Sequence, residues 1–536
     1  MKKLFAIILA LVMVFAMSAT AFADTTEDTT LTITDSTGRE YAGYKLLNLT
    51  TSLKTGDHHP TTCTGTHSSD CYNFAYTVNP TYRAILQEEV FTRGGNYIWD
   101  GIQMPATYAG VTDELILKYL GNQTSDEGDV YHTMRIVADR LYRAIKEANI
   151  PADKTGMDGS DEIEQGYWII ADITNLTGNE ANSLVMVDTK GQDALTINPK
   201  IGLPTIEKKV KDIDDSEDDN ISDNAWMDSA DHDIGDTVPF KLTATLPSNL
   251  QGYQTYKLIF HDTLSAGLNL KNNTVKVLMY ETAYKASVDT DVNDGIEVTD
   301  SFALATTGIN FEIACDNILA IPGVTKDTAF VVYYEAVLNE DAVIGAAGNP
   351  NEVYLEFSNN PYSDGIGETE KDKVIVFTYQ VVINKTDSHG HALKGAGFTL
   401  YKKNLAGTYE TIGTELKGTD MTTFTWKGLD DGDYKLVETT VPEGYNKMTD
   451  MVFSISATHS ETADEPTLDS LDGGTVMGTG DVTTGTLTKN VENKTGTVLP
   501  ETGAQGTFML ITIGSILVAA AVVFMITRKK MSIYEV

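Results

Sequence analysis

The chain has few cysteines, and it has far fewer basic than acidic residues. Three cysteines among 536 residues exclude a disulfide framework. Lys and Arg number 39 against 76 Asp and Glu, and the resulting net charge of −37 excludes nucleic acid as a partner. No Ser-His-Asp, Cys-His, paired-carboxylate or phosphate-loop pattern stands in a supporting context. We therefore expect no enzymatic activity, no cofactor and no metal site.

Long apolar runs are missing everywhere except at the two ends. Lys2 and Lys3 precede an apolar stretch, and Ala21-Phe22-Ala23 offers a small-x-small cleavage site, so residues 1–23 are predicted to be a signal peptide. The C-terminal run 508–526 has about 20 residues, enough to cross a bilayer as a helix, and a basic segment, 528–530, follows it. The remainder is an exported body long enough for three domains.

Short runs of alternating apolar and polar residues indicate many short strands. Examples are 239–246, 329–336 and 353–357, which predict a mainly β chain of tandem immunoglobulin-like sandwiches. The first domain differs, because apolar residues recur at helical spacing over 130–145, with a weaker helical pattern over 113–120. We expect this domain to carry helical insertions.

Breaks in the strand pattern suggest the domain boundaries. Two prolines and a glycine interrupt residues 198–204, and a polar, glycine-containing stretch covers 361–373. We expect an N-terminal domain over 24–200, a middle domain over 201–365, a third domain over 374–496 and a C-terminal segment over 497–536.

A lysine and an asparagine are predicted to point into the core of the middle domain. Lys208 shares a strand face with Ile206 and Val210, and Asn359 shares one with apolar residues of the last strand. Burying an amine and an amide is costly unless they satisfy each other. One solution is a covalent bond, in which a neutral amine attacks the carboxamide and a protonated carboxyl assists. Asp262 is the candidate acid and Glu335 the reserve.

The third domain repeats this arrangement. Lys385 lies on the inward face of its first strand and Asn493 on that of its last. Glu438 falls among inward apolar residues on a strand between them. We expect a second Lys–Asn bond here, promoted by Glu438. The opening strand of the first domain, 31–35, has no lysine at the equivalent position, so no such bond is expected there.

Two loops contain residues that could be read as ligand sites. Cys63 and Cys71 flank a short histidine-containing loop and are read as a possible disulfide, with a zinc-like site or two free thiols as alternatives. The acidic run 212–219 lacks the glycine and terminal glutamate of a calcium loop, so we interpret it mainly as a solvated interdomain loop.

Several motifs together resemble a known family. Leu499-Pro500-Glu501-Thr502-Gly503, followed by the apolar run and basic tail, resembles the sorting signal of Gram-positive surface proteins, which sortase cuts between Thr and Gly. The segments 383–387, 434–445 and 491–496 look like the isopeptide-bonded B-type domain of backbone pilins, in which Glu438 matches the glutamate of the "E box". The middle domain resembles the second domain of the same pilins. The resemblance is weakest over 24–190.

The resemblance implies a polymerisation mechanism and a set of partners. In backbone pilins a lysine near the end of the first domain attacks the acyl-sortase, and Lys200 occupies that place, although Asn198 and Ile201 depart from the usual motif. The chain is thus identified as a structural subunit of a covalent, wall-anchored pilus. The expected partners are sortase, other copies of the chain, peptidoglycan, minor pilins and host surface ligands. The alternatives are a monomeric wall-anchored adhesin and a minor basal pilin.

Overall fold

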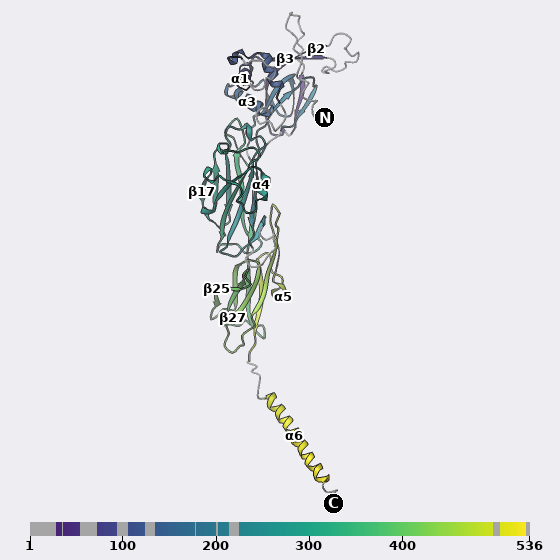
Figure 1. The fold of residues 1–536 in the computed structure, drawn as a ribbon, viewed down its shortest axis with the longest axis vertical. Helices are drawn as coiled ribbons and strands as arrows, with labels where there is room; N and C mark the ends of the chain where they lie inside the picture. The colour runs from purple at the N-terminus through teal and green to yellow at the C-terminus, as the bar shows by residue number, and fades with distance from the viewer. Residues whose placement is uncertain are drawn as a thin grey trace.

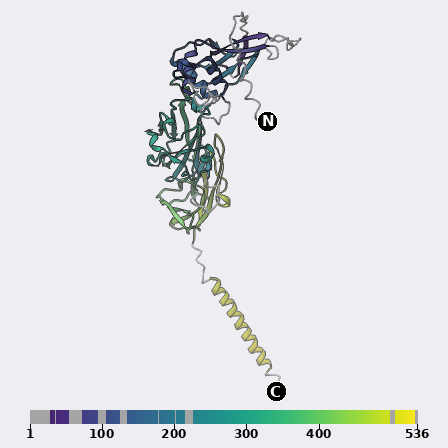
Figure 2. The ribbon, with the colours of Figure 1, turned by 45° about the horizontal axis from the view of Figure 1, so that its top comes forward.

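The computed structural model describes residues 28–34, 36–53, 72–93, 105–123, 134–176, 178–199, 202–213, 225–496 and 504–531. Three β-rich domains follow one another along the long axis, and a single helix lies beyond the third (Figure 1). The same order is visible after a 45° turn (Figure 2). The predicted mainly β architecture of tandem domains, with helices in the first, is confirmed.

In its described residues the first domain has two small sheets and three α-helices. The strands are β1 (Asp28–Ile33), β2 (Tyr41–Leu53), β3 (Tyr72–Val78), β4 (Lys154–Met157), β5 (Ser160–Glu164), β6 (Gly166–Asp172), β7 (Leu184–Asp188) and β8 (Ala194–Ile197). One sheet has the order β3-β2-β6-β7, with β4 beside β2, and the other has the order β5-β1-β8. The helices are α1 (Arg83–Arg93), α2 (Asp113–Gly121) and α3 (Met134–Glu147), with a 3-10 turn η2 (Tyr108–Gly110).

Helices α3 and α2 form where the sequence pattern predicted them, whereas α1 was not predicted. Val137, Leu141 and Ile145 make the buried face of α3, as the helical spacing requires. Thr112 caps α2 by accepting a hydrogen bond from the backbone N–H of Leu115 at 3.4 Å. These helices and one face of the β3-β2-β6-β7 sheet enclose an apolar core.

The middle domain is a sandwich of two larger sheets. One has the order β10-β9-β12-β19-β15-β16 and the other β11-β22-β20-β13-β18-β17, with β14 beside β19 and β21 beside β20. The strands are β9 (Thr205–Lys211), β10 (Trp226–Met227), β11 (Ser229–Asp231), β12 (Thr237–Thr245), β13 (Leu258–Leu264), β14 (Leu268–Leu270), β15 (Lys276–Tyr280), β16 (Ile296–Glu297), β17 (Ala303–Thr307), β18 (Asn310–Cys315), β19 (Ala329–Leu338), β20 (Asn349–Ser358), β21 (Ile366–Glu368) and β22 (Asp372–Phe377). Short helical segments are η3 (Leu250–Gly252), η4 (Asn272–Thr274), α4 (Ala283–Val288), η5 (Thr299–Ser301) and η6 (Ile318–Ala320). The sequence placed the end of this domain at residue 365, whereas β21 and β22 carry its sheet to Phe377.

The third domain is a smaller sandwich with a parallel pair of strands. Its sheets have the orders β26-β23-β30 and β25-β24-β27-β28-β29. The elements are β23 (Tyr379–Asp387), β24 (Gly397–Lys403), β25 (Tyr409–Lys417), β26 (Thr423–Leu429), β27 (Gly432–Thr440), β28 (Met451–His459), β29 (Leu468–Asp472), α5 (Gly474–Met477) and β30 (Thr486–Asn493). The first strand, β23, and the last, β30, run parallel to each other.

Hydrogen bonds join neighbouring domains. Arg143 in α3 donates to the carbonyl of Gly252 at 2.7 Å and to that of Pro361 at 3.0 Å, which ties the first domain to the middle one. At the other junction Lys402 in β24 donates to Asp233 at 2.6 Å. The domains are therefore in direct contact at both junctions.

The C-terminal helix α6 (Ala504–Met531) stands apart from the body. Its stretch Leu510–Arg528 is long and apolar enough to cross a membrane, with a mean hydropathy of 2.5 and none of it buried. The apolar cores of the body draw on residues between Leu31 and Val491. These clusters contain no residue of α6, so removing α6 takes away none of their packing.

Candidate functional site: two buried amine–amide–acid clusters

The third domain brings together the three residues predicted for its internal bond. Lys385 in β23, Glu438 in β27 and Asn493 in β30 are each only 1% exposed. Inward residues alternate along β23, so Lys385 follows Val381 and Ile383 into the core. Because β23 and β30 pair in parallel, Lys385 lies opposite Val491, two residues before Asn493 on the same face of β30.

The hydrogen bonds of this cluster fix the amide against the acid. Asn493 Nδ2 donates to Glu438 Oε1 at 2.7 Å, and the backbone N–H of Met448 donates to Glu438 Oε2 at 2.8 Å. Lys385 Nζ donates to the carbonyls of Val491 and Thr386, each at 3.0 Å. Burial lowers the pKa of Lys385, and the nearby Glu438 opposes this shift in part. A lowered pKa makes the neutral, nucleophilic amine more accessible.

The amide of Asn493 would have to rotate before its carbonyl oxygen faces Glu438. Its Oδ1 has no hydrogen-bond partner among the described residues. Because the two ends of an amide have nearly the same shape, rotating it by 180° would present Oδ1 to Glu438, whose carboxyl can donate to it only when it carries a proton. That contact would polarise the carbonyl for attack by Lys385.

The middle domain holds a second cluster, between its two sheets. Lys208 Nζ in β9 donates to Asp262 Oδ2 in β13 at 2.5 Å and to the hydroxyl of Tyr334 in β19 at 3.0 Å. The same hydroxyl lies 2.9 Å from Asp262 Oδ2 and accepts a hydrogen bond from Asn351 Nδ2 in β20 at 2.7 Å. None of the four side chains is more than 1% exposed.

Apolar surroundings shift the acid and the amine toward their neutral forms. Burial lowers the pKa of Lys208, and Asp262 opposes the shift. Burial raises the pKa of Asp262, and Lys208 opposes it in turn. The rings of Phe240 and Tyr334 lie 5.8 and 5.5 Å from Lys208 Nζ and help to exclude water. A neutral amine beside a protonated carboxyl is the state from which amide exchange can begin.

The structure does not bring Asn359 to Lys208. Asn359 Nδ2 donates instead to the carbonyls of Ile366 at 2.9 Å and Leu176 at 3.4 Å, at the junction with the first domain. Asn359 is buried, as its position in the alternating strand predicted, and Asn351 is buried on the same face. The segment between them spans about 26 Å at about 3.3 Å per residue. Asn351, which the sequence analysis did not select, lies at the level of Lys208.

The reserve acid of the middle domain faces away from the cluster. Asp262 points inward from β13, which strand parity alone did not decide. Glu335 accepts hydrogen bonds from Lys271 at 2.7 Å and from the Tyr333 hydroxyl at 3.0 Å, on the face of β19 opposite Tyr334. Asp262 is therefore the acid positioned to act on Lys208. Tyr334 was not predicted as a site residue, although alternation in β19 places it on the inward face.

Other predicted site residues lie outside the described part of the chain. These are Lys200, Cys63, Cys71 and the sorting-signal residues Leu499, Pro500, Glu501, Thr502 and Gly503. The remaining cysteine, Cys315, is a buried free thiol in β18.

Comparison with known proteins places two segments in described families. Residues 234–361 match the family model of the Gram-positive pilin backbone subunit 2, Cna-B-like domain. Residues 379–466 match the model of the SpaA prealbumin-like fold domain. The chain is 27% identical over 272 residues to the trypsin-resistant surface T6 protein of Streptococcus pyogenes serotype M6, which covers 47% of this chain and 45% of the relative. The chain thus spans less than half the length of that relative.

Solved structures of pilins are similar at lower identity. The T6 backbone pilin of Streptococcus pyogenes serotype M6 is 17% identical, with a TM-score of 0.48, and the match covers 87% of this chain and 98% of that one. The full-length major pilin SpaD of Corynebacterium diphtheriae is 16% identical, with a TM-score of 0.40 and coverage of 66% and 87%. The segments that match domain families are thus residues 234–361, for the Gram-positive pilin backbone domain, and residues 379–466, for the prealbumin-like fold domain.

Proposed function

We propose that the chain is the backbone subunit of a covalent pilus on a Gram-positive cell surface. The observation that carries the proposal is the buried Lys–acid–Asn cluster in a domain that matches the pilin backbone model. The similarity to the T6 surface protein and the apolar helix α6 support the same role.

Each cluster would form one internal isopeptide bond. The lone pair of the lysine Nζ attacks Cγ of the asparagine, the Cγ–Nδ2 bond breaks, and ammonia leaves. The buried carboxyl donates a proton toward the amide and takes one from the attacking amine, so no other reactant is needed. The pairs would be Lys208 with Asn351, promoted by Asp262, and Lys385 with Asn493, promoted by Glu438.

Assembly would use the two ends of the body. Sortase would cleave between Thr502 and Gly503, hold the chain as a thioester, and transfer it to Lys200 of the next subunit. Repetition gives a head-to-tail fibre, and a final transfer to a peptidoglycan amine would anchor it to the wall. Minor pilins and host surface ligands would then bind to the assembled fibre.

The test is a Lys200→Arg variant expressed together with the cognate sortase. We expect the ladder of high-mass covalent species to disappear, while a Lys190→Arg control, a lysine near the end of the same domain, keeps it. A ladder that persists in Lys200→Arg would contradict the proposed linkage. A wild-type chain that reaches the wall only as a monomer would favour the wall-anchored adhesin instead.

A further inference from the structure

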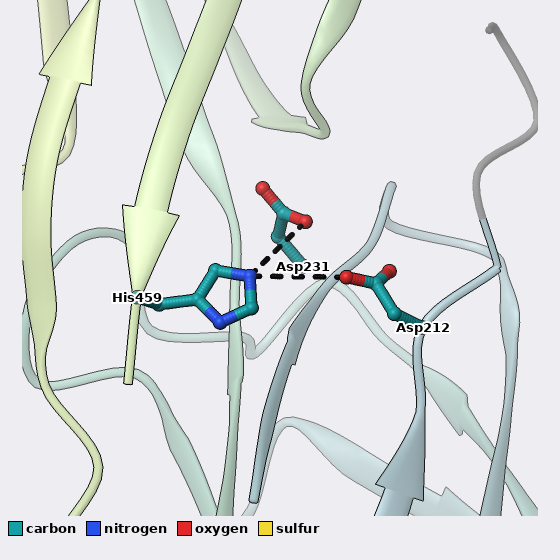
Figure 3. A group of neighbouring side chains, drawn as sticks. All are labelled: Asp212, Asp231 and His459. Carbon is teal, nitrogen blue, oxygen red and sulfur yellow. Dashed lines mark ion pairs between the residues drawn. The ribbon is translucent and has the colours of Figure 1, made fainter. Parts of the chain in front are cut away.

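Three metal-ligating side chains converge where the middle and third domains meet. Asp212 directly follows β9, Asp231 ends β11, and His459 ends β28 of the third domain (Figure 3). His459 Nε2 lies 3.8 Å from Asp212 Oδ2 and 3.8 Å from Asp231 Oδ1. Their side chains are 16%, 6% and 9% exposed in chain order, so the group is largely shielded from water.

A hydrogen bond outside this group sets the orientation of the imidazole. Ser229 Oγ donates its one proton to the carbonyl of Ser460 at 2.7 Å. It also lies 2.8 Å from His459 Nδ1, so it must accept the hydrogen bond there and Nδ1 must carry the proton. With Nδ1 as the donor to Ser229, Nε2 is the ring nitrogen that faces the two carboxylates, and its lone pair is the one available to an ion. Histidines that bind metals are oriented in this way by a hydrogen bond to the other ring nitrogen.

The distances suit an ion better than a direct contact. A separation of 3.8 Å is longer than an N–H···O hydrogen bond. The ligand atoms all lie within 4.8 Å of one another. A tetrahedral ion with bonds of about 2.1 Å holds its ligands about 3.4 Å apart, so a small inward movement would complete the site.

A buried tyrosine lies beside the group. Tyr379, at the start of β23, is fully buried, and its hydroxyl interacts with the Asp231 carboxylate. Carboxylates that bind metals are commonly held by such outer contacts.

We propose that Asp212, Asp231 and His459 bind a divalent transition-metal ion, for which Zn²⁺ is the probe. One imidazole and two carboxylates suit Zn²⁺ better than Ca²⁺, which prefers oxygen ligands alone. Two ligands come from the middle domain and one from the third, so the ion clamps the two domains together. This inference does not depend on polymerisation.

The experiment measures Zn²⁺ bound per molecule of the body, residues 24–496, by equilibrium dialysis, together with thermal unfolding. We expect His459→Ala to bind one Zn²⁺ fewer than the wild type and to lose a Zn²⁺-dependent rise in Tm. Zn²⁺ bound elsewhere, including near Cys63 and Cys71, would remain in both proteins and cancel in the difference.

His261 offers a matched control, because it also lies between two acids. Its ring nitrogens are 3.3 Å from Glu312 and 3.7 Å from Glu356, all within the middle domain. We expect His261→Ala to bind as much Zn²⁺ as the wild type. Asp212→Asn, at the partly exposed edge of the group, should show the same loss as His459→Ala and covers the case in which that variant misfolds. Equal Zn²⁺ stoichiometry in wild type, His459→Ala and Asp212→Asn would overturn the proposal, as would a wild type that binds no Zn²⁺.

Discussion

Lys385 lies directly opposite Val491 in the parallel pairing of β23 with β30, and its Nζ donates to the Val491 carbonyl at 3.0 Å. The next inward residue of β30 is Asn493, whose amide bonds to Glu438. Parallel pairing of the first and last strands therefore brings the amine, the amide and the acid to one level of the core. We expect the bond to form in the folded domain without any external catalyst.

Replacing the acid of the third domain should prevent its internal bond. We expect wild-type body to have an intact mass lower than its translated sequence by two ammonia molecules, and Glu438→Ala to lack only one. Loss of the cross-link, which closes a loop of roughly 100 residues, should lower stability by about 4–5 kcal/mol. Glu492→Ala, on the exposed face of β30, is the control and should keep both losses. An unchanged deficit in Glu438→Ala would refute this role for the acid.

The two candidate asparagines of the middle domain can be separated by the same measurement. We expect Asn351→Ala to lose one of the two ammonia deficits, because Asn351 lies beside the Lys208–Asp262–Tyr334 group. Asn359→Ala should keep both deficits, since its amide contacts Ile366 and Leu176. The opposite outcome would restore Asn359 as the partner of Lys208.

The stability of Asn351→Ala should depend on pH in a way that the bonded protein does not. In this variant Lys208 remains an amine, and burial holds its pKa below the ordinary 10.5. Between the folded pKa and 10.5 the unfolded chain binds a proton that the folded chain lacks, so the free energy of unfolding rises with pH. In the wild type the proposed Lys208–Asn351 amide would not titrate. Urea unfolding should therefore show the stability gap between the wild type and Asn351→Ala narrowing as the pH rises toward 10.5, and a constant or widening gap would contradict a buried amine.

A glycine at the junction of the middle and third domains tests how closely they pack. Gly428 has a φ of +72°, and a Cβ there would overlap the Ile234 side chain, whose backbone N–H donates to the Gly428 carbonyl at 3.0 Å. Gly407 has a φ of +76° and open space around it. Both Ala variants incur a backbone cost of about 1–2 kcal/mol, but only Gly428→Ala should also separate the domains. We expect limited proteolysis to cut the junction faster in Gly428→Ala, and equal rates would show that the contact is dispensable.

Strand alternation predicted which way the site residues point but not how far along the strands they lie. Lys208, Lys385, Glu438 and Asn493 face the core as their neighbours implied, because the period of two is a local property. Asn359 lies at a different level from Lys208, because the level of a residue depends on how strands distant in the sequence align. The pairing of Asp262 with Val353, and of Leu264 with Asn351, sets that level. Strand alternation also could not predict that Asp212, Asp231 and His459 lie together, because they lie in or next to strands of two different domains.

The parallel course of β23 and β30 has a mechanical consequence. The chain enters the third domain at the start of β23 and leaves it at the end of β30, so tension slides the two strands past each other in shear and stresses their whole ladder of hydrogen bonds at once. With Lys385 joined to Asn493, the load would pass directly from one strand to the other and bypass the chain between them. A protease cut anywhere between Lys385 and Asn493 would then leave the covalent connection from one end of the domain to the other intact.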